Sequence, residues 1–268
     1  MKSLPASLRA VWRLTRVAIH LAGGAATVAC VYPLAARRTR LALKRRWSRQ
    51  LLGMLGVRLR VDGACSGALR VANHVSWLDV IAVNAAAPSA FVAKEDVRAW
   101  PLVGWLCARS ETVFIRRASR RAAHATAGRV AGLLAAGVEV ALFPEGPTSD
   151  GRAVLPFQGA LLEGAIAAGA CVQPLVLRYE CAAGRRSDAA VFCGDASLAQ
   201  SLWRVASADA LTVRLRFLAA QDAACGERRE LAAMLRRRIA GVLDEFEAAV
   251  EVLDERRAVD GGAELAPG

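Results

Sequence analysis

The sequence lacks the motifs of several common enzyme classes. Its 268 residues contain no Gly-x-Ser-x-Gly elbow, no glycine-rich phosphate loop and no Cys-x-x-Cys pair. The missing elbow argues against a serine hydrolase, and the missing phosphate loops argue against nucleotide-dependent chemistry. The seven cysteines are odd in number, so neither a structural zinc site nor a disulfide framework is indicated. Such cysteine use fits a catalytic domain on the reducing, cytoplasmic side.

Acidic residues are absent from the first 60 positions. This segment carries 13 of the 36 basic residues, whereas the remaining 208 residues carry 23 basic and 24 acidic side chains. The net charge of +12 therefore originates at one end of the chain. A nucleic-acid-binding enzyme usually distributes basic residues over its working surface, so we do not expect nucleic acid as a partner. A hydrophobic fraction of 55% with 22% charged residues also excludes an intrinsically disordered chain.

The basic end contains an apolar run over residues 17–36, in which only His20 could carry a charge. A helix of this length spans about 30 Å, the thickness of a bilayer core. Basic residues on both flanks suit anionic headgroups but define no orientation. We therefore expect a transmembrane or re-entrant helix. A buried core helix and a cleaved signal peptide are the alternatives, although a signal peptide usually has a shorter apolar region.

Residues 41–57 alternate leucines, Trp47 and Met54 with a cluster of lysine and arginine. This pattern is typical of a basic amphipathic helix lying in a membrane interface. An ordinary surface helix is the alternative. Residues 1–60 are thus expected to form membrane-anchoring helices that bind an anionic membrane.

The rest of the chain alternates short apolar runs with segments of helical length. The pattern predicts an α/β fold with a mixed, partly parallel sheet flanked by helices. One catalytic domain is expected over residues 61–253, ending in a packing helix, with a frayed tail over 254–268. The expected strands are 68–72, 90–94, 112–116, 138–143, 172–178, 189–193 and 211–218, and the expected helices are 77–87, 97–108, 122–136, 161–168 and 227–250.

Histidine is scarce, and of the three histidines His74 is the best placed to act as a general base. It precedes Asp79 by five positions, which on a regular helix would leave the two side chains about 140° apart. They can meet only at a junction, and Ser76 followed by Asp79 predicts a helix N-terminus there. Asp79 would then orient the imidazole while His74 takes a proton from an alcohol. Alternatively, Ser76 and Asp79 merely cap a helix and His74 is an ordinary loop residue.

A second unusual segment, Phe143-Pro144-Glu145-Gly146, ends a strong strand. Open α/β sheets bind ligands in the loops beyond the carboxyl ends of their strands. Gly146 permits close approach of the backbone, and Glu145 offers a carboxylate that could hold an acceptor hydroxyl. The alternative is a simple turn with a solvated glutamate. No protein nucleophile accompanies His74, which favours direct attack by a hydroxyl of a bound substrate.

Four segments in order resemble the motifs of the lysophospholipid acyltransferase family, the glycerolipid acyltransferases that include 1-acylglycerol-3-phosphate acyltransferase. The matches are Asn73, His74 and Asp79 in the first motif, Phe114 to Arg117 in the second, Phe143 to Gly146 in the third and Val172 to Val176 in the fourth. Their order and spacing agree over roughly residues 45 to 220. Four motifs in sequence are far more specific than any one of them.

The resemblance implies that His74, oriented by Asp79, deprotonates the hydroxyl of a lysolipid, which then attacks the thioester of acyl-CoA or acyl-carrier protein. It implies no cofactor beyond this co-substrate, and no metal. Arg117 would bind an anionic group of the acceptor, because a guanidinium suits phosphate. The remaining substrate-binding positions carried over are Asn73, Phe114, Glu145, Gly146 and Pro174, of which Glu145 and Gly146 would shape the acceptor pocket and Pro174 would support the sheet end near it.

Two departures from the family pattern concern the acceptor. The family usually has Gly where this chain has Glu111, and Thr-Arg-Ser where this chain has residues 147–149, Pro-Thr-Ser. The branch that acylates lyso-ornithine lipid resembles the version found here. We expect phosphatidic acid to be made from 1-acylglycerol-3-phosphate, with lyso-ornithine lipid acylation or a non-catalytic membrane adaptor as alternatives. The expected location is a membrane, the bacterial inner membrane, with the catalytic domain on its cytoplasmic face.

Overall fold

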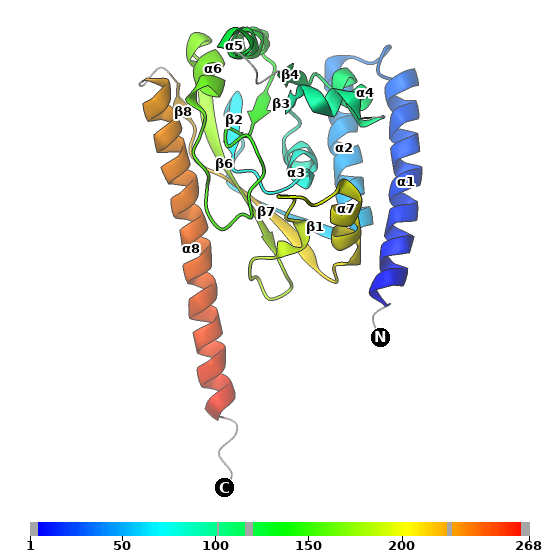
Figure 1. Cartoon of the computed structure of the whole chain (residues 1–268), viewed down its shortest axis with the longest axis vertical. Helices are drawn as coiled ribbons and strands as arrows, with labels where there is room; N and C mark the ends of the chain where they lie inside the picture. The colour runs from blue at the N-terminus through cyan, green and yellow to red at the C-terminus, as the bar shows by residue number, and fades with distance from the viewer. Residues whose placement is uncertain (1–4, 101, 116–119, 224–226, 264–268) are drawn as a thin grey trace.

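The computed structural model describes residues 5–100, 102–115, 120–223 and 227–263 (Figure 1). The N-terminal half comprises α1 Ala6–Cys30, α2 Arg37–Leu55, β1 Val57–Asp62, β2 Leu69–Ala72, α3 Leu78–Ala86, β3 Ala90–Lys94, η1 Glu95–Ala99, α4 Val103–Arg109, β4 Val113–Ile115 and α5 Arg120–Ala135. The C-terminal half comprises β5 Val140–Leu142, η2 Gly159–Leu162, α6 Glu163–Ala167, β6 Cys171–Glu180, η3 Asp188–Ala190, α7 Leu198–Ser207, β7 Leu211–Phe217, β8 Gln221–Asp222 and α8 Arg228–Ala263.

The strands form one sheet in the order β1-β7-β6-β2-β5-β3-β4, with β8 beside β6. Strands β6, β2, β5, β3 and β4 pair in parallel, β6 and β7 pair antiparallel, and β1 is parallel to β7. The predicted mixed, partly parallel sheet is therefore confirmed. Helices lie on both of its faces, with α1, α2 and α3 on one side and α8 on the other (Figure 1).

The two faces of the sheet bury separate apolar clusters, because successive residues of a strand point to opposite sides. Leu175, Leu177 and Tyr179 of β6 belong to the cluster beneath α2 and α3. Val172 and Val176 of the same strand face the helices on the other side. This alternation places Tyr179 under the helix that carries Asp79.

Several predicted boundaries differ from the structure. Residues 189–193 form no strand, because they continue from the short helix η3 into a loop. The strand β1 begins at Val57, inside the segment expected to be helical, because Arg58 and Arg60 alternate with apolar residues that pair with β7. Helix α7 was not predicted, although Ser197 and Gln200 form a full capping box at its start. Helix α8 continues to Ala263, so residues 254–263, which were expected to fray, are helical.

The apolar run 17–36 does not form one helix. Helix α1 ends at Cys30, the following residues including Pro33 form turns, and α2 begins at Arg37. Within the described ranges, no helix is both long and apolar enough to span a bilayer. At Gly24, an added Cβ would lie 2.4 Å from Nε1 of Trp47, so this glycine allows α1 and α2 to pack closely.

Three basic residues of α2 bind neighbouring parts of the domain. Nζ of Lys44 donates to the carbonyl oxygens of Ser89 (2.8 Å) and Ser110 (3.2 Å). Arg45 and Arg49 donate to the last carbonyls of α3, where the negative end of the helix dipole attracts cations. Leucines 51, 52 and 55 on the same helix are buried in the core. The contacts of Lys44, Arg45 and Arg49 favour the alternative, an ordinary surface helix packed on the domain, and the position of residues 41–57 in a membrane interface stays a prediction.

Candidate active site

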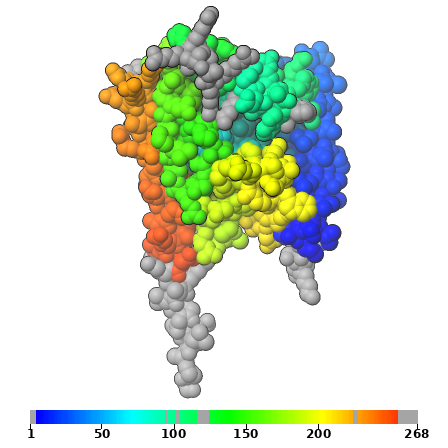
Figure 2. All heavy atoms as spheres, in the orientation of Figure 1, coloured from blue at the N-terminus to red at the C-terminus, as the bar shows by residue number. Residues whose placement is uncertain are grey.

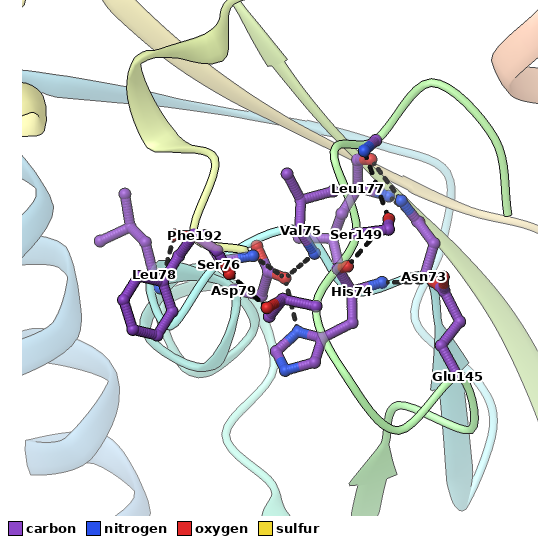
Figure 3. A network of polar contacts seen from close by, with 12 residues as sticks. Asn73, His74, Val75, Ser76, Leu78, Asp79, Glu145, Ser149, Leu177 and Phe192 are labelled. Carbon is purple, nitrogen blue, oxygen red and sulfur yellow. Dashed lines mark hydrogen bonds and ion pairs between the residues drawn. The ribbon is translucent and has the colours of Figure 1, made fainter. Parts of the chain in front are cut away.

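The segment 73–77 joins β2 to α3 at the carboxyl edge of the parallel strands (Figure 3). Strand β5 is the parallel neighbour of β2, so the loop that starts at Phe143 emerges beside it. The first and third sequence motifs are brought together for this reason, as the rule for open α/β sheets predicts.

His74 and Asp79 are in contact, which confirms the predicted junction. Nδ1 of His74 lies 2.8 Å from Oδ2 of Asp79. The same oxygen accepts the backbone N–H groups of Val75 (2.7 Å) and Ser76 (2.9 Å). Helix α3 begins at Leu78, one residue later than a Ser76 cap would place it, and the Ser76 hydroxyl accepts from the Leu78 N–H at 3.3 Å.

The position of Asp79 determines the protonation pattern of the imidazole. An ionised carboxylate only accepts hydrogen bonds, so Nδ1 of His74 carries the proton and Nε2 of the neutral ring carries a lone pair. Among the described residues, Nε2 has no hydrogen-bond partner. Asp79 is completely buried, whereas the His74 side chain is 16% exposed. Nε2 is thus the unbonded nitrogen of a partly exposed side chain.

The loop after β5 holds the backbone and ring of His74. Oε1 of Glu145 accepts the His74 N–H at 2.7 Å, and the His74 carbonyl accepts from N (2.8 Å) and Oγ (3.2 Å) of Ser149. The imidazole stacks on the Phe143 ring, with centroids 4.1 Å apart and planes 10° from parallel. Behind it, Phe91 stacks on Phe143. These contacts limit the imidazole to one orientation.

Glu145 was predicted to offer a carboxylate to the acceptor, but it is buried and both oxygens are engaged by the backbone. Its Oε2 accepts the Leu155 N–H at 2.9 Å. Burial raises the pKa of Glu145, and the two backbone donors partly offset this rise. Gly146 has a φ of +90°, a conformation that favours glycine, and closes the tight turn by donating to the Phe143 carbonyl. Substrate contact by either residue stays a prediction.

Asn73 and Pro174 support the sheet. Nδ2 of Asn73 donates to the Leu177 carbonyl (2.9 Å), and its Oδ1 accepts the Leu177 N–H (2.8 Å). These bonds extend the pairing of β2 and β6 beyond its last register position, and they occupy both ends of the buried amide. These bonds give Asn73 a structural role, and its contact with substrate stays a prediction. Pro174 lies opposite Val71 and accepts from the Leu218 N–H, so it supports the sheet as expected.

The second motif lies farther from the dyad. Phe114 is in β4, at the edge of the sheet, where the Arg98 guanidinium lies 5.6 Å from its ring centroid. Arg117 is outside the residues that the structure describes. Glu111 has a φ of +64°, a conformation that glycine adopts without strain, and its carboxylate pairs with Arg37 at 3.4 Å. The roles of Phe114 and Arg117 in binding the acceptor stay predictions.

Sequence reasoning missed Tyr179 and Ser149. The Tyr179 hydroxyl donates to Oδ1 of Asp79 at 2.6 Å (atoms 100 residues apart in the chain). The alternation of Leu175, Leu177 and Tyr179 along a buried strand was a usable signal for its orientation. No sequence spacing, however, indicates which residue of another element lies opposite it. Within the described ranges, no cluster of three or more His, Cys, Asp or Glu side chains could hold a metal ion.

Comparisons with known proteins agree with this geometry. A family model described as acyltransferase matches residues 60–178. A 1-acyl-sn-glycerol-3-phosphate acyltransferase of Neisseria meningitidis is 42% identical over 164 residues, which are 61% of this chain and 64% of that protein. A lyso-ornithine lipid O-acyltransferase of Pseudomonas aeruginosa is 38% identical over 181 residues, which are 67% of this chain and 69% of that protein.

The crystal structure of the 1-acyl-sn-glycerophosphate acyltransferase PlsC from Thermotoga maritima has the same fold. It superposes with a TM-score of 0.68 at 22% identity and covers 90% of this chain and 95% of that one. Fold and site together define an α/β protein with a His–Asp pair at the carboxyl edge of a partly parallel sheet. The chain belongs to the acyltransferase family.

Proposed function

We propose that this protein is a lysolipid O-acyltransferase in which His74 is the general base. The observation that carries the proposal is the asymmetry of the imidazole. Its Nδ1 is bonded to Asp79, whereas its Nε2 has no partner among the described residues, and the side chain is partly exposed. A base with one bonded and one unbonded nitrogen suits the removal of a proton from an alcohol.

The proposed reaction is direct acyl transfer. Nε2 of His74 takes the proton of the lysolipid hydroxyl as the oxygen attacks the carbonyl carbon of an acyl thioester, supplied by acyl-CoA or acyl-carrier protein. The tetrahedral intermediate then collapses, the C–S bond breaks, and the imidazolium returns the proton to the thiolate. The Asp79 carboxylate stabilises the imidazolium between these steps. Base catalysis of this kind contributes about 10² to 10⁴ in rate.

The first candidate acceptor is 1-acylglycerol-3-phosphate, which would give phosphatidic acid. It is supported by the relative from Neisseria meningitidis, whose aligned region spans 64% of its length. Arg117 remains the proposed ligand of the acceptor phosphate because of its motif position.

The second candidate acceptor is a lyso-ornithine lipid. At the position where the family commonly has an arginine, Thr148 turns into the protein and donates its hydroxyl proton to the Phe192 carbonyl. This position therefore presents no cation to a phosphate. The relative from Pseudomonas aeruginosa supports the same alternative.

We further propose that the protein binds an anionic membrane through an apolar surface on α1, α4 and α7, without spanning it. The surface comprises Leu8, Val11, Trp12, Ile19, Leu102, Trp105 and Trp203, all of which are exposed. Figure 2 shows the three helices next to one another on the molecule. Arg16 lies over Trp12 and Arg109 over Trp105, so cations border the apolar side chains. This composition suits the headgroup boundary, and the catalytic domain would face the cytoplasm.

The test uses the full chain reconstituted in vesicles. Labelled acyl-CoA is supplied with lysophosphatidate or lyso-ornithine lipid, and products are identified by mass spectrometry. We expect a diacyl product from one acceptor and none from the His74→Ala variant. Undiminished turnover by that variant would disprove the proposed chemistry. Vesicle binding without product from any lysolipid or thioester donor would instead support the non-catalytic adaptor.

A further inference from the structure

The Asp79 carboxylate is held from two elements. Oδ2 accepts three donors from its own loop, Nδ1 of His74 and the N–H groups of Val75 and Ser76. Among the described residues, Oδ1 accepts one donor, the Tyr179 hydroxyl of strand β6, at 2.6 Å. The loop thus holds Oδ2 of Asp79, and the sheet holds Oδ1 through Tyr179.

Tyr179 is buried in the core. It is 2% exposed, and its ring belongs to the apolar cluster beneath α3 together with Leu175 and Leu177. Burial and the adjacent carboxylate raise the pKa of Tyr179 well above its ordinary value, because both disfavour the phenolate. The hydroxyl therefore keeps its proton and donates it to Asp79.

We propose that Tyr179 is a positioning residue of the active site, which acts on His74 through Asp79. Any turn of the carboxylate about its Cβ–Cγ bond moves both oxygens together, so the bond from the sheet to Oδ1 opposes a turn that would carry Oδ2 away from Nδ1 of His74. Oδ2 then stays directed at Nδ1 of His74, and Nε2 stays directed toward the acceptor. This inference rests on the proposed base catalysis by His74.

The competing explanation is that Tyr179 only fills space in the core, which a phenylalanine would do equally well. The two explanations differ in the hydroxyl alone, so Tyr179→Phe is the decisive variant. The chain has one other tyrosine, Tyr32, whose hydroxyl donates to the Arg40 carbonyl at 3.3 Å. Tyr32→Phe removes the same group away from the dyad and is the matched control.

Acyl transfer by the vesicle-bound full chain is measured with acyl-CoA and lysolipid. We expect Tyr179→Phe to lower kcat about 10- to 100-fold with KM within about twofold, because a buried charged oxygen loses its donor while substrate contacts remain. Tyr32→Phe should leave both constants unchanged. In an Asp79→Ala background, Tyr179→Phe should cause no further loss, because the two residues act as one unit.

Nuclear magnetic resonance can test the effect of Tyr179 on His74 without measuring turnover. The chain has three histidines, so ¹⁵N-labelled histidine gives few signals, and comparison with His74→Ala identifies those of His74. The resonance of the His74 Nδ1–H proton should shift in Tyr179→Phe and not in Tyr32→Phe. If Tyr179→Phe does not fold, 3-fluorotyrosine in the Tyr32→Phe chain labels Tyr179 alone and keeps its hydroxyl. Its ¹⁹F resonance should then respond to Asp79→Asn.

The outcomes separate this inference from the proposed function. Unchanged kcat and an unchanged Nδ1–H resonance in Tyr179→Phe, with His74→Ala inactive, would overturn the role of Tyr179 and leave base catalysis intact. Activity retained by His74→Ala would instead disprove the proposed function. A fluorine signal that ignores Asp79→Asn would also overturn the positioning role.

Discussion

Nε of Arg49 in α2 donates to the carbonyl oxygen of Ala85 at 2.8 Å, in the last turn of α3. Helix α3 carries Asp79 in its first turn. The basic helix that follows the N-terminal apolar run is therefore bonded directly to the helix that carries Asp79. At this point the positive charge of α2 binds a helix end of the same domain.

The first prediction concerns Arg49. Arg49→Ala should lower the free energy of unfolding by about 1 kcal/mol, because a charged donor to the terminal carbonyls of a helix is lost. The matched control is Arg46→Ala, an exposed neighbour on the same helix, which should change stability by less than about 0.5 kcal/mol. Denaturant titration of both variants provides the measurement, and equal effects would contradict this role of Arg49.

The second prediction is a pH dependence of stability that originates at Lys44. Burial lowers the pKa of Lys44 from 10.5 to about 8. Between these values the unfolded chain binds the proton and the folded chain does not, so unfolding takes up a proton and stability rises with pH. The charged form is therefore a cost to the folded state that is present below about pH 8 and is relieved as the pH rises toward 10.5.

Comparison with Lys44→Met isolates this contribution. The difference in unfolding free energy, wild type minus variant, should increase from pH 7 to pH 10 by on the order of 2 to 3 kcal/mol. Urea titrations at each pH measure this difference. The pH-dependent contributions of the other titratable groups are the same in both proteins and cancel. A flat or falling difference would show that Lys44 keeps its charge in the folded protein.

The third prediction separates the observed contacts of Asn73 from the role that the motif suggests. Asn73→Ala removes both bonds to Leu177 and leaves a buried backbone pair without partners. Stability should fall by about 1 to 3 kcal/mol, while KM for the lysolipid stays within about twofold. Thermal unfolding and steady-state kinetics test the two parts. A higher KM with unchanged stability would instead support Asn73 as a substrate ligand.

The fourth prediction concerns membrane binding. Trp12→Ala and Trp203→Ala should each weaken binding to anionic vesicles about tenfold, because each removes a large aromatic side chain from the proposed surface. The control is Leu253→Ala, which removes an exposed apolar side chain from α8 on the other side of the sheet. Co-sedimentation measures the affinity. Equal losses for all three would indicate nonspecific adsorption.

Much of the fold and the centre of the site could be predicted from sequence because they depend on local signals. The apolar runs of the parallel strands specify buried strands, and the contact of His74 with Asp79 follows from a helix start between residues only five positions apart. Glu145 was likewise singled out by its place after a strand. The fate of its carboxylate was not predictable, because one donor, the His74 N–H, comes from another loop and the other, the Leu155 N–H, lies ten positions farther along its own irregular loop.

The remaining features depend on which elements pack together. The alternation of cations and leucines in residues 41–57 is typical of a helix on a membrane surface. The same sequence pattern also fits a helix whose cations bind the carbonyl oxygens of a neighbouring helix. Only the packing of α2 on α3 distinguishes the two cases. Tyr179 approaches Asp79 across 100 residues of chain because β6 is the parallel neighbour of β2. Strand order is a property of the assembled sheet, and no local periodicity encodes it.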